Sequence, residues 1–274
     1  MVILIIGWTF SVVTDTGYAA VVIAVIIATL MSLGGYYKGD KVALLSAGAK
    51  GPIEKKDNAY VYRMVENLCI ATGMPLPKIY IINDPAINAF ATGRDPQHSS
   101  IALTTGAIKE LENEELEGVI AHELSHIKNY DIRLMTIVIV LIGVITLLAD
   151  FFIRSSFHGK RGSSKSNANG ILIIVGIVFI ILSPFIGRLI QFAISRKREF
   201  LADASGSLMT RYPEGLARAL EKIAAQSTPL QRTSNATAHL YIANPFGSTK
   251  KFLSKSFSTH PPINERVKAL RNMA

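Results

Sequence analysis

Residues Ala121-His122-Glu123-Leu124-Ser125-His126 place two histidines four positions apart in a stretch with helical character. Side chains at i and i+4 lie on one face of a helix, about one turn apart, so both imidazoles can reach the same ion. Glu123 is rotated by roughly 100° from His122, which makes it a poor ligand beside the histidines. A carboxylate there can instead act as general base, taking a proton from a water molecule that the metal activates. The spacing therefore predicts a hydrolytic zinc site on a helix.

A third ligand is expected, because a catalytic zinc site has three protein ligands and one open position. The best candidate is Glu199, within Arg198-Glu199-Phe200-Leu201-Ala202-Asp203. Asp203 lies one helical turn further on and faces the same way, so it could accept the second ring N–H of a ligand histidine. The alternative is an exposed helix with scattered charges. We expect one Zn²⁺ per chain, held by His122, His126 and Glu199.

The composition indicates a membrane protein, because 49% of the 274 residues are hydrophobic and the mean hydropathy is +0.32. Apolar stretches cover residues 1–14, 17–37, 134–149 and 171–187. At about 1.5 Å per residue, 17–37 is long enough to cross the roughly 30 Å hydrocarbon core. The first stretch is short, and the last two are marginal in length. We expect two hydrophobic hairpins.

These hairpins divide the chain into an N-terminal membrane hairpin (1–37), the first half of a protease domain (38–133), a second hydrophobic hairpin (134–195) and the second half of the domain (196–274). The two halves must lie on the same side of the membrane to share one metal. Five lysines follow the second apolar stretch, whereas the loop 14–17 has no basic residue, which predicts a cytoplasmic domain. Four spans would place the loop 154–170 outside the cytoplasm, but this loop is basic. The positive-inside rule therefore disagrees with this orientation for the second hairpin.

Between the hairpins the pattern is that of an α+β domain. Residues 58–72 predict an amphipathic helix ended by Gly73, and 78–82, 88–92 and 99–104 predict strands. A helical region follows from 105 to 130. The overall fold class is thus a mostly helical membrane protein with a zincin-like catalytic domain carrying a small β-sheet. The predicted substrate-binding residues form an edge strand that pairs with an extended peptide: Asn88, Ala89, Phe90, Ala91 and Thr92. The alternative for this segment is a plain strand and turn.

The net charge of +9 could indicate a protein that binds nucleic acid. No RRM, zinc-finger or helix-turn-helix signature is present, and many basic residues flank apolar stretches, where they would meet anionic lipid headgroups. We therefore expect a lipid bilayer and no nucleic acid as partner. The single cysteine, Cys69, is expected to be a buried core thiol.

Four stretches resemble the HtpX-type membrane metalloproteases, distant relatives of the CAAX prenyl endopeptidases. They are spread in order over nearly the whole chain: Asn88–Gly93, Ala121–Asp131, Arg198–Asp203, and Ser258–Pro262 with Arg266. The resemblance implies zinc on His122, His126 and Glu199 and Glu123 as base, with Asp203 and Asn129 supporting the ligands. From the related prenyl endopeptidases, His260 and Arg266 are expected to stabilise the oxyanion of the tetrahedral intermediate. The alternative for His260 is the start of a helix before Pro261-Pro262.

The resemblance also implies a multi-pass protein of the bacterial inner membrane, with its site facing the cytoplasm. Its expected role is quality control under stress, through cleavage of misfolded or damaged membrane proteins or peptides. The sequence leaves the oligomeric state open.

Two other functions compete with this one. An intramembrane protease would carry the motif inside an apolar span, but here it follows the charged segment 110–117. A non-catalytic zinc-binding membrane scaffold would normally have four protein ligands and no adjacent base, so the free Glu123 argues against it.

Overall fold

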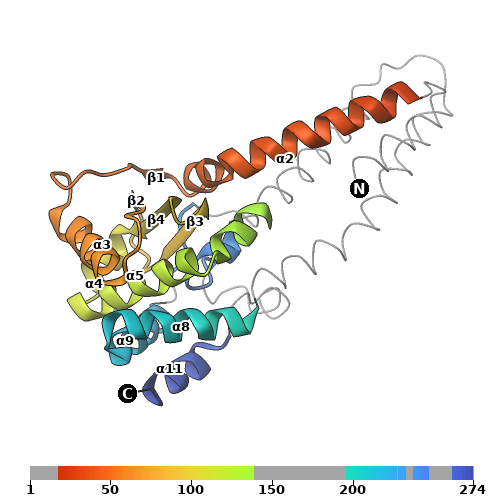
Figure 1. Cartoon of the computed structure of the whole chain (residues 1–274). Coiled ribbons are helices and arrows are strands. Elements are labelled where there is room, and N and C mark those ends of the chain that lie inside the picture. The colour runs from red at the N-terminus through yellow and green to blue at the C-terminus, as the bar shows by residue number, and fades with distance from the viewer. Residues whose placement is uncertain (1–17, 139–194, 227, 233–236, 247–260, 274) are drawn as a thin grey trace, which may run out of the picture.

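The computed structural model describes residues 18–138, 195–226, 228–232, 237–246 and 261–273 (Figure 1). The predicted first and fourth apolar stretches, residues 139–149 of the third, and His260 lie outside the described residues. The first half of the domain contains α2 (Tyr18–Ser46), β1 (Ala49–Lys50), α3 (Ala59–Thr72), β2 (Lys78–Ile82), β3 (Ala89–Asp95), β4 (His98–Thr104), α4 (Thr105–Glu110) and α5 (Asn113–Lys128). The second half contains α8 (Arg196–Thr210), α9 (Pro213–Ala225), the 3-10 turn η1 (Ala238–Leu240) and α11 (Ile263–Arg271).

The sheet has four strands in the order β1-β2-β4-β3. β2 runs parallel to β4, whereas β1 and β3 pair antiparallel with their neighbours. The three predicted strands are confirmed, and the two-residue β1 is an addition that the sequence pattern did not indicate. β3 lies at one edge of the sheet, next to α5 in space (Figure 1).

The local signals at the ends of the helices act as expected. The Asn58 side chain accepts a hydrogen bond from the Val61 N–H and so caps α3 at its start. Gly73 ends α3 in the left-handed conformation (φ 67°), which a glycine adopts at little cost. The predicted helical region 105–130 is in fact two helices. The break falls at Leu111 and Glu112, where a capping box between Glu112 and Glu115 starts α5.

α5 is the central helix of the domain. Its residues from Glu115 to Ile127 are buried, apart from a partly exposed Glu117. It packs against α8, α9 and the edge strand β3, as Figure 1 shows. Gly118 permits the close approach of α9, because a Cβ atom at this position would lie 2.7 Å from the Leu216 backbone nitrogen. Because other elements surround α5 on nearly all sides, the segment that carries the two histidines has few exposed positions.

Residues 18–37 of the second predicted apolar stretch lie within one continuous helix, α2. In the part of the chain that the structure describes, none of the helices meets both the length and the hydropathy expected of a membrane crossing. The two membrane hairpins therefore stay predictions.

Candidate metal centre

Three potential ligand atoms converge where α8 crosses α5. The Nε2 atoms of His122 and His126 are 3.2 Å apart. The Glu199 carboxylate oxygens lie 3.8 Å from His122 Nε2 and 3.7 Å from His126 Nε2. Tetrahedral zinc with bonds of about 2.0–2.1 Å separates its ligand atoms by roughly 3.3–3.4 Å. The spacing of these three groups therefore fits a single zinc ion.

Both histidines are held by a carboxylate on the ring nitrogen that faces away from this cluster. His122 Nδ1 lies 2.9 Å from an oxygen of Asp203, and His126 Nδ1 lies 3.0 Å from an oxygen of Asp131. In the neutral ring, a carboxylate that accepts the Nδ1 proton fixes the tautomer, and the Nε2 lone pair then points toward the cluster. The two imidazoles are thus oriented for metal binding by the folded protein itself.

Each of these carboxylates also accepts hydrogen bonds from an arginine. Arg266 of α11 donates two hydrogen bonds to Asp203, of 2.6 and 2.9 Å, and Arg198 donates one of 2.9 Å to Asp131. Arg266 is fully buried, whereas the Arg198 side chain is 35% exposed. The site is consequently built from two His–Asp–Arg chains, of which one is sealed from solvent and the other reaches the surface.

Glu123 lies next to the ligands but faces the sheet. Its side chain is 1% exposed, and the carboxylate lies near the backbone of Ala91 in β3, which favours its charged form. Burial raises the pKa of Glu123 to about 7. A carboxyl group with a pKa near neutrality can both take up and release a proton at physiological pH. This is the property that a general acid–base residue needs.

The two histidines differ in their affinity for protons. Burial lowers the pKa of His122 to about 4, so this ring is neutral and ready to bind a metal. Burial acts in the same direction on His126, but the hydrogen bond to Asp131 and the carboxylates of Glu199 and Glu123 prevail and raise its pKa to about 9. A metal must therefore displace a proton from His126 at neutral pH.

The structure places most of the predicted site residues together, on four elements: His122, Glu123 and His126 on α5, Glu199 and Asp203 on α8, Arg266 on α11, and Asn88–Thr92 on and beside the start of β3. Asn129 is different. It caps the C-terminal end of α5 through its backbone and makes no hydrogen bond to either histidine among the described residues. Asp131, and not Asn129, contacts a ring nitrogen of His126.

Sequence reasoning did not identify Asp131 and Arg198 as site residues. Asp131 follows His126 by five positions and closes the segment 121–131, so an acid at that spacing was the available signal. Arg198 directly precedes Glu199, the predicted third ligand, but its sequence neighbours give no sign of a partner on another helix. Only the packing of α8 on α5 brings Arg198 to Asp131.

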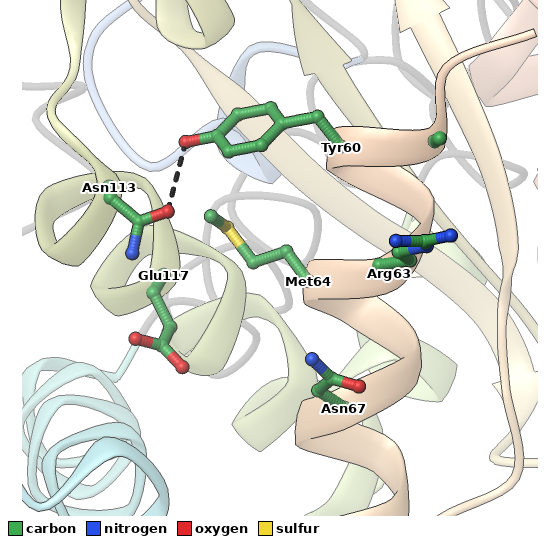
Figure 2. Close-up of a pocket in the computed structure, with 7 residues that line it drawn as sticks. Tyr60, Arg63, Met64, Asn67, Asn113 and Glu117 are labelled. Carbon is green, nitrogen blue, oxygen red and sulfur yellow. Dashed lines mark hydrogen bonds between the residues drawn. The ribbon is translucent and has the colours of Figure 1, made fainter.

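A pocket of about 330 Å³ lies away from these ligands, between α3 and the N-terminal half of α5 (Figure 2). It is lined by Ala59, Tyr60, Arg63, Met64, Asn67, Asn113 and Glu117. The Tyr60 hydroxyl donates a 3.3 Å hydrogen bond to Asn113 across its mouth. The Arg63 and Asn67 side chains are exposed, so the pocket is an open groove at the surface.

Comparison with known proteins agrees with the geometry of the site. The profile of peptidase family M48 matches residues 55–274. A protease HtpX homolog from Dictyoglomus turgidum is 48% identical over 259 residues, which is 94% of this chain and 84% of that protein. A second protease HtpX homolog, from Thermoanaerobacter pseudethanolicus, is 44% identical over 277 residues, 100% of this chain and 91% of that protein.

A solved structure shares the fold. The crystal structure of Ste24p from S. mikatae superposes with a TM-score of 0.55 at 20% sequence identity. The match covers 98% of this chain but only 62% of that one, so the present chain spans under two thirds of Ste24p.

Proposed function

Because the chain belongs to peptidase family M48 and is a metalloprotease of the HtpX type, we propose that it hydrolyses peptide bonds in misfolded or damaged membrane proteins. One observation carries the proposal. The two histidines of α5, Glu199 of α8 and the adjacent Glu123 are buried in one cluster with the spacing of a zinc site. We propose one Zn²⁺ per chain, bound by His122, His126 and Glu199.

When bound, zinc supplies a Lewis acid that polarises the substrate carbonyl and lowers the pKa of a water molecule. The protein contributes the proton transfers. Glu123 takes the proton of the attacking water as the new C–O bond forms. It then delivers this proton to the amide nitrogen as the C–N bond breaks. A pKa raised by burial suits both steps, because neither the charged nor the neutral form of Glu123 is strongly favoured near pH 7.

The contacts of Arg266 favour a role other than the oxyanion stabilisation expected from the resemblance. Its guanidinium donates to Asp203 twice and to the Ile242 carbonyl at 3.4 Å. An arginine so engaged is better suited to hold Asp203, and through it His122, than to bind an oxyanion. We therefore propose Arg266 as a positioning residue. His260, outside the described residues, is our remaining candidate for the oxyanion.

Anchoring in a lipid bilayer is a further part of the proposal. α2 exposes a stripe of large apolar side chains at helical spacing: Val22, Ile26, Leu30, Leu33 and Tyr37, each more than half exposed. An exposed apolar stripe of this length is unfavourable in water and is typical of a surface that meets lipid or protein. Exposed Lys38 and Lys41 follow it directly, as at a headgroup boundary. We propose a multi-pass protein of the bacterial inner membrane with its site on the cytoplasmic side.

The function is tested by Glu123→Gln in the full-length, detergent-purified protein. Glutamine has nearly the same shape but cannot accept the proton. Zinc content by elemental analysis should therefore stay near one per chain, while digestion of a misfolded membrane protein is lost. Glu110→Gln, which removes one exposed carboxylate from α4, is the matched control and should keep both. Appreciable proteolysis by zinc-loaded Glu123→Gln would exclude Glu123 as the base.

A further inference from the structure

Tyr130 has a backbone conformation that is unusual for a large side chain. Its φ is +60°, in the left-handed region that residues with a Cβ atom rarely adopt. Among the described residues other than glycine, only Arg211 also has a positive φ, of 54°. A bulky residue in this region is strained, and such strain persists only where the surrounding structure enforces it. The strained residue lies four positions after His126, which connects it to the metal centre.

The turn at Tyr130 places Asp131 against His126. In an uninterrupted helix of 3.6 residues per turn, a residue five positions after His126 would lie about 140° around the axis from it. The Asp131 carboxylate would then face away from the imidazole. In the structure α5 ends at Lys128, and a new helical stretch, 131–138, begins directly after Tyr130. With this change of direction, Asp131 Oδ2 lies 3.0 Å from His126 Nδ1.

The backbone of Tyr130 is fully hydrogen-bonded in this conformation. Its N–H donates to the Ile127 carbonyl, and its carbonyl accepts from the Arg133 N–H, both at 3.2 Å. The first bond belongs to the end of α5 and the second to the start of the stretch 131–138, so one left-handed residue joins two helices without an unpaired backbone group. The ring is 47% exposed, and the Arg133 guanidinium lies 5.0 Å from its centre. The backbone of Tyr130, rather than its ring, is therefore the part connected to the metal centre.

Asp131 in turn connects two ligands of the proposed zinc ion. One of its oxygens contacts His126, and the other accepts a 2.9 Å hydrogen bond from Arg198. The Asp131 side chain is only 5% exposed. Arg198 directly precedes Glu199, the ligand that α8 contributes. One carboxylate thus holds His126 of α5 and the start of α8 at the same time.

We propose that Tyr130 is a positioning residue for the metal centre. Its left-handed conformation places Asp131 between His126 and Arg198, and so sets the ligands of α5 and α8 relative to each other. This inference rests on the zinc site of the proposed function. Glycine adopts the left-handed conformation at little cost, whereas a β-branched residue adopts it with strain. The zinc affinity should therefore follow the ease of this conformation at position 130 and not the size of the side chain.

Tyr130→Gly and Tyr130→Val test the proposal, because both remove the ring but only glycine favours a positive φ. Zinc affinity is measured by chelator competition in the full-length, detergent-purified protein, well below its unfolding temperature. The unfolding temperature of each variant is recorded in parallel. Arg211→Val is the matched control, since it puts the same strained side chain at an exposed position at the end of α8, twelve residues after Glu199.

We expect Tyr130→Gly to bind zinc within about twofold of the wild type. Tyr130→Val should bind on the order of tenfold more weakly, as for loss of a group that supports a metal ligand. Arg211→Val should lower the unfolding temperature but keep the wild-type affinity. Equal affinities in the glycine and valine variants would overturn the proposal. An equal loss of affinity in Arg211→Val would do the same, because it would show a general effect of destabilisation.

A second measurement tests whether Tyr130 acts through Asp131. In the Asp131→Ala background the carboxylate is absent, so Tyr130→Val should change zinc affinity by no more than about twofold. A loss as large as in the parent protein would show that Tyr130 acts by another route and contradict the proposal. Tyr130→Ala, with a smaller side chain, replaces the valine variant in both measurements if that variant does not fold. Absence of zinc binding by the wild-type protein would instead contradict the proposed metal centre.

Discussion

Gly206 of α8 packs directly on the backbone of His122 in α5: a Cβ atom placed on Gly206 would lie 3.0 Å from the His122 nitrogen. The same atom would lie 3.1 Å from the Ala121 carbonyl carbon. Real side chains rarely approach a backbone so closely, so only glycine lets the two helices meet here. Their approach brings Glu199 and Asp203 of α8 within reach of the histidines.

We expect Gly206→Ala to weaken zinc binding by about tenfold or more, since α8 must shift by a few tenths of an ångström and carry Glu199 with it. Displaced supporting groups typically cost about 10–100-fold in metal affinity. Zinc affinity can be measured by competition with a chromophoric chelator. Gly34→Ala is the control, because a Cβ atom on Gly34 meets nothing within 4 Å. Equal affinity in both variants would show that the helix contact does not position the site.

Glu199→Ala should abolish stable zinc binding while the protein stays folded. Two histidines alone make a weak site, and catalytic zinc normally has three protein ligands. Glu265→Ala removes an exposed carboxylate of α11 and should retain the metal. Elemental analysis after dialysis separates the two variants. If Glu199→Ala keeps its zinc, the third ligand lies elsewhere, and the buried His239 would be the next residue to test.

Arg266→Met should destabilise the protein by about 3–5 kcal/mol, because it leaves the buried Asp203 carboxylate with His122 but without its cationic partner. Thermal unfolding of the metal-free protein measures this. The double variant Asp203→Asn/Arg266→Met also removes the buried negative charge, so it should recover part of the lost stability. A residue that only bound an oxyanion would instead lower the turnover number without a change in the unfolding temperature.

Zinc binding should strengthen with pH. The pKa of His126 is raised to about 9, so in the metal-free protein its ring is charged at pH 7 and must lose a proton to bind. The apparent affinity should therefore rise about tenfold per pH unit between pH 7 and 9 and level off above pH 9. Asp131→Asn removes a carboxylate that raises the pKa of His126. The pH above which the zinc affinity is constant should therefore be lower in this variant. Asp57→Asn, at an exposed loop position, should leave the profile as in the wild type.

An affinity that stays flat from pH 7 to pH 9 would show that His126 is already neutral. The proton count gives a second measurement. Calorimetric titrations in buffers with different ionisation enthalpies report the protons released per zinc bound, and we expect about one at pH 8.

Much of this site follows from patterns that span only a few residues. The i, i+4 spacing puts His122 and His126 on one face of a helix and turns Glu123 away from them, whatever surrounds that helix. Asn58 and Gly73 likewise mark the ends of α3, because caps act on the nearest backbone groups. The sequence alone thus determined the helix that carries the two histidines and Glu123, the candidate pair Glu199 and Asp203, and three of the four described strands.

Only the tertiary structure decided which groups contact the residues of the candidate site. Asp131 rather than Asn129 meets His126, because the chain turns after α5 and carries that carboxylate back to the ring. Arg266 reaches Asp203 across a separation of 63 residues. The Ile242 N–H donates to the Ala89 carbonyl, and the Thr136 hydroxyl donates to the Gly93 carbonyl, from segments that no local pattern connects to β3. Such contacts depend on how whole helices pack around α5, and packing is a property of the assembled core, which spacing along the chain does not encode.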